Sequence, residues 1–293
     1  MRLGDDQYCV RMPQGERPSL LRRRLALGLA KLRRQAGMEI EDVRAALGMS
    51  RAKLYRIESP DSAITVSIPD VIALCHVYGA SAHVQAQLVE MARHRDGWWT
   101  AYQSGLTGWF VDYVMLEAEA SEFFEFAIDA VPGLLQTEDY AREVIAAWTP
   151  EADASAIDAR VAARMERQRR LTDGLAVTAV VDEYALVRPT GSSKQMRGQL
   201  ERLLDLAKQP NVKLHVLPTT SGAHAALTSP FNMLHFRNMP PIVYVDTLSG
   251  GLYVDDERDV ERYEAVADQL LTRSLSAAKS RKLIERCLED LRA

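Results

Sequence analysis

The sequence predicts two domains of different fold class, an all-α domain of five short helices followed by a mixed α/β domain. The chain has 293 residues, which is enough for about two domains of ordinary size. Between residues 19 and 96, apolar residues recur at the three- and four-residue spacing of amphipathic helices. Beyond residue 97, aromatic and β-branched runs of strand length alternate with helical patterns.

A flexible arm is expected ahead of the first domain. Residues 1–18 contain Pro13, Gly15 and Pro18 and have no apolar periodicity, which is typical of irregular chain. The helical domain is then expected to cover residues 19–96, and the α/β domain residues 97–293.

Glycines are expected to end the first two helices of the all-α domain. A leucine stripe from Leu21 to Leu32 predicts the first helix, which ends at Gly37. The apolar residues of Ile40–Leu47 predict a second short helix, and Gly48 stops it. Because glycine tolerates a positive φ, Gly48 suits a tight link to a following helix.

Serines are expected to begin the remaining three helices. Ser50 is a good N-cap for the third helix, in which Leu54 and Ile57 face inward. The fourth helix is predicted over Ser67–Gly79, where Ser67 is the N-cap and an early proline follows it. The fifth is predicted from Ser81 to about His94.

The α/β domain is expected to contain five strands and five helices. The strand patterns, bounded by Pro, Gly and Asn, are Phe124–Ala130, Leu175–Asp182, Lys213–Pro218, Phe231–Phe236 and Ile242–Asp246. The helical patterns are Gly108–Glu122, Thr137–Trp148, Ala154–Thr172, Lys194–Gln209 and Asp259–Leu291, the last broken near Ser274–Ser276.

The charge of the chain is distributed unevenly. The formal net charge is −4, which by itself argues against a nucleic-acid partner. The segment from Arg17 to Glu58, however, carries a local net charge of +7, whereas residues 59–293 carry −10. Phosphate binding depends on the local field, so the basic segment is compatible with DNA. Arg22, Arg23, Arg33 and Arg34 are its candidate phosphate contacts.

The predicted third helix has the residues that the major groove of DNA requires. One face is apolar, and the other carries Arg51, Ala52, Lys53, Tyr55 and Arg56. An arginine donates two hydrogen bonds to guanine O6 and N7, and an alanine methyl contacts the thymine methyl. The N-terminus at Ser50 also attracts a phosphate group. Double-stranded DNA is therefore the expected partner.

The segments Gly37–Val43, Leu47–Arg51 and Leu54–Glu58 resemble the XRE-type, phage-repressor-like helix-turn-helix. Five helices within residues 20–94 match the length of that domain. The resemblance implies that Arg51, Ala52 and Arg56 read bases. It implies further that the DNA backbone or flanking bases are contacted by Ser50, Lys53 and Tyr55.

Motifs in the rest of the chain resemble a large actinobacterial family. They include Trp109–Tyr113, Leu116–Ala120, Val131–Ala141, Ser221–His224 and Gly250–Tyr253. That family joins an XRE-type head to a C-terminal domain of uncharacterised function. It includes WhiJ-like regulators, which are described as antitoxin-like because a small partner protein is often encoded beside them. The resemblance implies a transcription factor, often a repressor, whose second domain senses a small-molecule effector or docks that partner.

A candidate effector pocket is suggested by polar residues at predicted strand and helix ends. These residues are Gln136, Thr137, Tyr140, His224, Tyr244, Asp246 and Tyr253. The structural alternative is that Thr137 caps a helix, the tyrosines fill the rim of the core, and His224 bonds a loop carbonyl. The sequence favours this alternative for any single residue.

The sequence gives little support for a catalytic function or for a metal site. No nucleophile elbow, HExxH or phosphate-binding loop is present, and the six histidines lack zinc-ligand spacing, so no metal or cofactor is expected. Glu117, Glu119 and Glu122 are candidates to hold a cation, but Glu117 and Glu119 would point apart on a helix, so a solvated helix face is the better interpretation. The pair Asp182-Glu183 suits either a catalytic site or a helix cap.

Three scattered cysteines and the lack of a membrane-length apolar run favour a location in the cytoplasm.

The leading hypothesis is a DNA-binding regulator that acts as a homodimer. Its two recognition helices would lie about 34–36 Å apart, one turn of DNA. The alternative is an antitoxin-like module that sequesters a small protein and binds DNA for autoregulation. An enzyme with a DNA-binding head ranks last.

Overall fold

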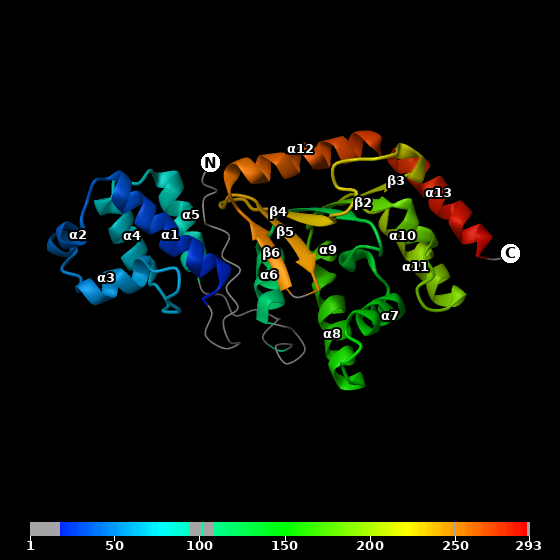
Figure 1. The fold of residues 1–293 in the computed structure, drawn as a ribbon, viewed down its shortest axis with the longest axis horizontal. Coiled ribbons are helices and arrows are strands. Elements are labelled where there is room, and N and C mark those ends of the chain that lie inside the picture. Colours follow the sequence, from blue (N-terminus) through cyan, green and yellow to red (C-terminus); the bar gives the residue numbers. More distant parts are fainter. Residues whose placement is uncertain (1–17, 94–100, 102–107, 249, 292–293) are drawn as a thin grey trace, which may run out of the picture. The chain divides into compact units, whose positions relative to one another are not determined.

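The computed structural model describes residues 18–93, 101, 108–248 and 250–291. The chain divides into two compact units, Met1–Arg95 and Asp96–Ala293, and each is described here by itself (Figure 1). The flexible arm expected at residues 1–18 lies, apart from its last residue, outside the described residues.

The first unit consists of five α-helices. They are α1 (Leu20–Gln35), α2 (Ile40–Leu47), α3 (Arg51–Glu58), α4 (Ile68–Val77) and α5 (Ala82–Ala92). Ser50, Ser67 and Ser81 cap α3, α4 and α5, as their sequence positions predict. Gly48 lies between α2 and α3 with a φ of 65°, a left-handed conformation that favours glycine.

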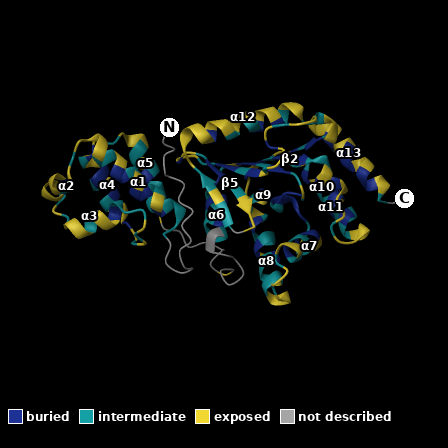
Figure 2. Cartoon of the chain, viewed as in Figure 1, coloured by how far each residue is buried: buried dark blue, intermediate teal, exposed yellow. Residues whose placement is uncertain are grey.

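One apolar core holds these five helices together. It contains Leu25 and Leu29 of α1, Val43 of α2 and Leu54 and Ile57 of α3, together with residues of α4 and α5. In Figure 2, the buried residues lie on the inward sides of the helices and the exposed residues cover the outer sides. Each helix therefore buries one stripe, and the opposite side of α3 faces solvent.

The second unit is built on a six-stranded mixed sheet. Its strands are β1 (Glu122–Ala127), β2 (Ala176–Asp182), β3 (Val212–Leu217), β4 (Phe231–His235), β5 (Ile242–Thr247) and β6 (Gly250–Val254). Their order across the sheet is β3-β2-β1-β4-β5-β6. The first three strands are parallel, and β4, β5 and β6 extend the sheet as antiparallel neighbours.

Helices surround this sheet. The α-helices are α6 (Gly108–Glu119), α7 (Glu138–Trp148), α8 (Ala154–Arg167), α9 (Arg169–Thr172), α10 (Glu183–Val187), α11 (Ser193–Leu206), α12 (Glu257–Arg273) and α13 (Ala277–Asp290). Short 3₁₀ turns occupy Gly133–Leu135 and Thr219–Ser221. Figure 1 shows α12 running along one side of the sheet and α13 lying near β3.

The two faces of the sheet have different side chains, because neighbouring residues of a strand point to opposite sides. Phe124 and Phe126 of β1 pack with Phe231 and Met233 of β4 and with Leu270 of α12 in an apolar cluster. The opposite face carries Glu125. The strand register places Asn232, Tyr244 and Tyr253 in the same row as Glu125.

The predicted fold class is confirmed: a helical unit precedes a mixed α/β unit. All five predicted strands are present, and the long C-terminal helix is broken at Ser274–Ser276 as expected. The sequence prediction missed β6, whose five residues include two glycines, and the five-residue α10. Within the described part of the chain, every helix is too short or too polar to span a membrane.

Candidate nucleic-acid interface and polar cluster

The outward face of α3 presents the residues expected to contact DNA. Arg51, Ala52, Tyr55 and Arg56 are all exposed, and the Tyr55 side chain retains 66% of its accessible surface. Leu54 and Ile57 point into the core and are essentially buried. The side chains of α3 therefore separate into a buried stripe and an open polar face, which is the arrangement required of a helix that enters a DNA groove.

Ser50 and Lys53 are engaged in contacts within the domain. The Ser50 hydroxyl accepts a hydrogen bond from the Lys53 backbone N–H at 3.2 Å. The Lys53 Nζ lies 2.8 Å from Asp70 Oδ1 at the start of α4. Burial raises the pKa of Asp70, but hydrogen bonds from Lys53 and Ser67 outweigh it and hold this pKa below its usual value. Lys53 thus ties α3 to α4.

Arg22 is buried and does not fit its expected role as a phosphate contact. Its Nε donates to the Ile64 carbonyl at 2.8 Å, and its Nη2 donates to the Arg56 carbonyl at 2.7 Å. Burial also lowers the pKa of this guanidinium. One side chain of α1 therefore holds the end of α3 and the segment that follows it.

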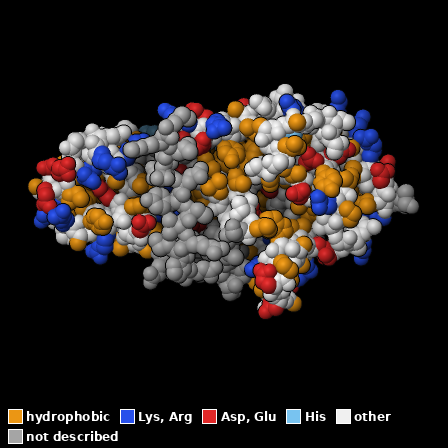
Figure 3. All heavy atoms as spheres, viewed as in Figure 1, with side chains coloured by type: hydrophobic (Ala, Val, Ile, Leu, Met, Phe, Trp, Pro, Cys, Tyr) orange, Lys and Arg blue, Asp and Glu red, His pale blue; other side chains and the backbone are white. Residues whose placement is uncertain are grey.

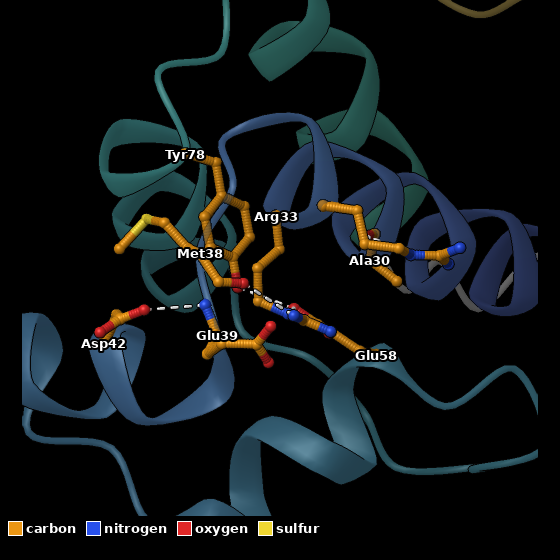
Figure 4. A network of polar contacts seen from close by, with 8 residues as sticks. Ala30, Arg33, Met38, Glu39, Asp42, Glu58 and Tyr78 are labelled. Atoms are coloured by element: carbon orange, nitrogen blue, oxygen red, sulfur yellow. Dashed lines mark hydrogen bonds and ion pairs between the residues drawn. The ribbon is translucent and has the colours of Figure 1, made fainter.

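The Arg33 side chain also forms hydrogen bonds within the domain, as Figure 4 shows. Its Nε donates to both carboxylate oxygens of Glu58, at 3.1 and 2.9 Å, and its Nη1 donates to the Met38 carbonyl at 2.9 Å. Glu58 accepts a further hydrogen bond from the Tyr78 hydroxyl at 2.7 Å. Burial and this carboxylate together raise the pKa of Tyr78. The network fixes the last residue of α3 between α1 and α4.

Arg23 and Arg34 are the two exposed members of the four predicted phosphate contacts. The Arg34 Nε donates to the Ala30 carbonyl of its own helix at 3.1 Å, which leaves the side chain at the surface. The sequence pattern did not separate these two arginines from Arg22 and Arg33, because burial depends on how α1 packs against α3 and α4.

The second unit contains a buried ion pair between α6 and α8. Arg167 Nε and Nη2 donate to the two Glu117 carboxylate oxygens at 2.7 and 2.6 Å. The side chains are 5% and 1% exposed, respectively. The guanidinium also lies over the rings of Phe110 and Tyr113, at 5.3 and 5.2 Å from their centroids. The expectation of a solvated face at Glu117 is therefore wrong.

Two further charged residues extend this cluster. Arg164, one turn before Arg167, donates to Gln136 Oε1 at 2.8 Å. Burial and the neighbouring Arg167 lower the pKa of Arg164 to about 10. Glu125 comes from the middle of β1, and burial raises its pKa to about 7. Its position inside the aromatic run Phe123-Phe124-Glu125-Phe126 is the sequence signal that could have identified it.

Three of the expected effector-pocket residues, Gln136, Thr137 and Tyr140, form hydrogen bonds with their own segment and with α8. The Gln136 side chain donates to the Val131 carbonyl at 2.7 Å and accepts from Arg164. Thr137 caps α7 by accepting from the Tyr140 N–H at 3.3 Å. The Tyr140 hydroxyl is buried and accepts from the Val131 N–H at 3.2 Å.

The remaining expected pocket residues lie on two different faces of the sheet. Tyr244 contacts Tyr113 of α6 and Tyr253, at ring-centroid distances of 4.4 and 5.1 Å, and its hydroxyl donates to Asp246 at 3.2 Å. The His224 ring instead packs edge-on against Phe126, 5.4 Å away, on the side of α12. The structure therefore does not bring the seven residues into a single pocket. The structural alternative for His224, a hydrogen bond to a loop carbonyl, also fails at Nδ1. This ring nitrogen is buried and has no hydrogen-bond partner.

We expect Glu125→Gln to flatten the dependence of stability on pH. The folded chain holds the Glu125 proton up to about pH 7, whereas an ordinary glutamate loses it near 4.5. The free energy of unfolding therefore falls as the pH rises through this window. E125Q should raise this free energy at pH 8 by up to about 3 kcal/mol, at about 1.4 kcal/mol per pKa unit.

Urea unfolding at pH 5 and pH 8 measures this effect. Glu122→Gln is the matched control, because Glu122 is exposed at the start of the same strand. An E125Q protein with the same pH dependence as E122Q would show that the Glu125 carboxyl does not stay protonated up to about pH 7.

The carboxylate pair Asp182-Glu183 is explained structurally. Asp182 caps α10 by accepting from the Tyr184 N–H at 2.9 Å. Glu183 accepts hydrogen bonds from the backbone N–H and the hydroxyl of Thr219, at 2.8 and 3.0 Å. Over the described residues, the side chains of His, Cys, Asp and Glu form no group that could hold a metal ion.

Two family models match the chain. Residues 24–88 match a helix-turn-helix domain, and residues 110–286 match a domain of unknown function, DUF5753. The first match begins within α1 and ends within α5, and the second covers most of the sheet unit. No curated protein and no solved structure is significantly similar to the chain.

Proposed function

Because the chain belongs to the DUF5753 family and carries a helix-turn-helix domain ahead of the family domain, we propose that it is a sequence-specific transcriptional regulator. Its first unit binds double-stranded DNA, and α3 enters the major groove. Arg51, Ala52 and Arg56 contact bases there, while Tyr55 contacts the backbone or flanking bases. Arg23 and Arg34 supply contacts to phosphate groups from α1.

The observation that carries this proposal is the open face of α3. Three polar side chains and one methyl group of this helix are exposed, and the hydrogen bond of Arg56 Nε goes to the Ala52 carbonyl of the same helix at 3.3 Å. At the same time Lys53, Arg22 and Arg33 are used to hold this helix in position. The domain thus presents a rigid reading surface, which is what base recognition requires.

We propose more specifically that the protein is a cytoplasmic repressor of the XRE type, related to the WhiJ-like actinobacterial regulators. It binds a pseudo-palindromic site as a homodimer, since one small helical domain makes few base contacts. The second unit senses a small-molecule effector or docks a small protein partner, and this changes the affinity for DNA.

A genome-wide pull-down of DNA by the purified protein tests the function. The wild-type chain should enrich discrete sites that share a two-fold motif, and the Arg51→Ala/Arg56→Ala variant should lose them at the same salt concentration. Enrichment spread evenly along the genome, equal for both proteins and abolished by moderate salt, would mean that the head binds only phosphate.

A further inference from the structure

The outward side of α13 carries a row of positive charges, here called the basic stripe. It consists of Lys279, Lys282 and Arg286, which follow one another at intervals of three and four residues and so lie on one side of the helix. All three residues are exposed. In Figure 3, Lys and Arg side chains gather along α13, at the right of the view.

The opposite side of α13 fixes the direction in which the basic stripe points. Leu283, Ile284 and Leu288 are buried against the rest of the second unit. Ser280 is buried as well, and its hydroxyl accepts a hydrogen bond from the Val216 N–H of β3 at 2.9 Å. The helix is therefore held to the sheet by one side, and the basic stripe faces solvent.

The basic stripe lacks the ion pairs that other exposed cations of the second unit form. Lys208 lies 2.8 Å from Asp205, and Arg262 lies 3.5 Å from Asp259. The three cations of the basic stripe form no ion pair with any residue that the structure describes. Residues 59–293 carry a net charge of −10, so a uniformly positive stripe differs from the rest of this part of the chain.

Helix stability does not explain the basic stripe. Lys279 lies in the first turn of α13, where the helix dipole favours acidic residues, and this turn contains none. Lys282 and Arg286 are four residues apart, and like charges at this spacing repel each other. An arrangement that disfavours its own helix indicates a negatively charged partner from outside the unit.

The surroundings of the basic stripe favour a polyphosphate over a protein or a membrane. Protein interfaces are usually anchored by large apolar or aromatic side chains, and a helix that binds a membrane inserts an apolar face. Among the described residues, none of the large hydrophobic side chains that remain exposed lies on α13. The partner is therefore recognised by charge alone.

The length of the basic stripe suits the backbone of DNA. Lys279 and Arg286 are seven residue steps apart, which corresponds to about 10.5 Å along a helix. One strand of double-stranded DNA has a phosphate group about every 3.4 Å along the axis. Three cations over this length can thus follow about three phosphate groups of one strand.

We propose that the basic stripe of α13 binds the phosphate backbone of double-stranded DNA independently of base sequence. This gives the second unit a DNA contact of its own, beyond the binding assigned to the first unit. The choice of DNA rests on the proposed function, because a chain held on DNA by α3 keeps its second unit at a high local concentration of phosphate groups.

Removal of the three charges from the full-length protein tests this contact. Lys279→Gln/Lys282→Gln/Arg286→Gln should raise the Kd for a duplex of arbitrary sequence at least about tenfold at low salt concentration. It should also lower the slope of log K against log salt concentration by about 2 to 3, because each phosphate contact contributes about 0.9. Glutamine keeps the helix propensity of the replaced residues, so α13 should remain folded.

The matched control removes three exposed cations from elsewhere in the second unit. Lys208→Gln/Arg258→Gln/Arg262→Gln changes the net charge by the same amount, but none of these residues lies on α13. This variant should change the Kd less than about twofold and leave the salt dependence as it is in the wild type.

Photo-cross-linking supplies a second measurement that does not depend on net charge. A benzophenone amino acid in place of Ala278, an exposed residue beside the basic stripe, should cross-link to the duplex. The same group in place of Ala265, which is exposed on α12, is the control and should give only background cross-linking.

The outcomes separate this inference from the proposed function. A Kd changed equally by both triple variants, or equal cross-linking from positions 278 and 265, would overturn the α13 contact and leave the α3 surface standing. If the α13 variant loses affinity for polyglutamate but not for the duplex, the partner is an acidic protein and the proposal is wrong. A wild-type chain that binds no duplex at low salt would overturn both proposals. Selective weakening by the α13 variant, with cross-linking from position 278, supports the contact whatever the genome-wide pull-down yields.

Discussion

Replacing both Arg51 and Arg56 by alanine is expected to weaken binding to a specific operator by about thirtyfold to twenty-thousandfold. A bidentate contact between an arginine and a guanine contributes about 1–3 kcal/mol of discrimination, and about 1.4 kcal/mol corresponds to a factor of ten. Both side chains are exposed on α3, and their removal leaves Leu54 and Ile57 in the core. The loss should therefore fall on affinity and leave the stability of the domain almost unchanged.

Titration of a labelled operator at fixed salt concentration measures this loss. The control is Arg258→Ala/Arg262→Ala, which removes the same charge from the exposed side of α12. The control should keep nearly wild-type affinity. Equal weakening by both double variants would mean that net charge, and not base recognition by α3, determines binding.

Arg167→Met is expected to lower the free energy of unfolding of the second unit by about 3–5 kcal/mol, because it leaves the Glu117 carboxylate buried without its partner. Glu117 accepts both of its hydrogen bonds from this one guanidinium. The double variant Glu117→Met/Arg167→Met should recover most of the loss, since apolar side chains of similar size often replace a buried pair at little cost.

Chemical denaturation of the three proteins measures these differences. Asp205→Ala breaks an exposed ion pair with Lys208 and serves as the control, with an expected change below about 0.5 kcal/mol. A single R167M change no larger than that of D205A would indicate that the ion pair between α6 and α8 does not lie in a buried environment.

The helical unit was largely predictable because its signals are local. Ser50, Ser67 and Ser81 each cap the helix that directly follows them, and Gly48 adopts the conformation that its position requires. The outward face of α3 follows from the positions of Leu54 and Ile57, since helical periodicity then assigns the other side to solvent.

The predictions failed where the outcome depends on distant packing. Nothing near Arg22 in the sequence indicates that Ile64, 42 residues later, will accept its hydrogen bond. Glu117 and Arg167 are 50 residues apart, and periodicity alone could not pair them. The sequence predicts one pocket for His224 and Tyr244 because both lie near strand or helix ends, but the face on which a side chain lies depends on the strand register.

The way in which α3 is attached has a consequence for the evolution of such regulators. Arg22 holds this helix through the backbone carbonyl of Arg56, a group that every amino acid provides. The residues that would read DNA can therefore be exchanged without loss of this attachment. A new operator preference could arise by point substitutions at positions 51, 52, 55 and 56 within an unaltered scaffold, and duplicated copies of the gene could diverge in their targets while they retain one architecture.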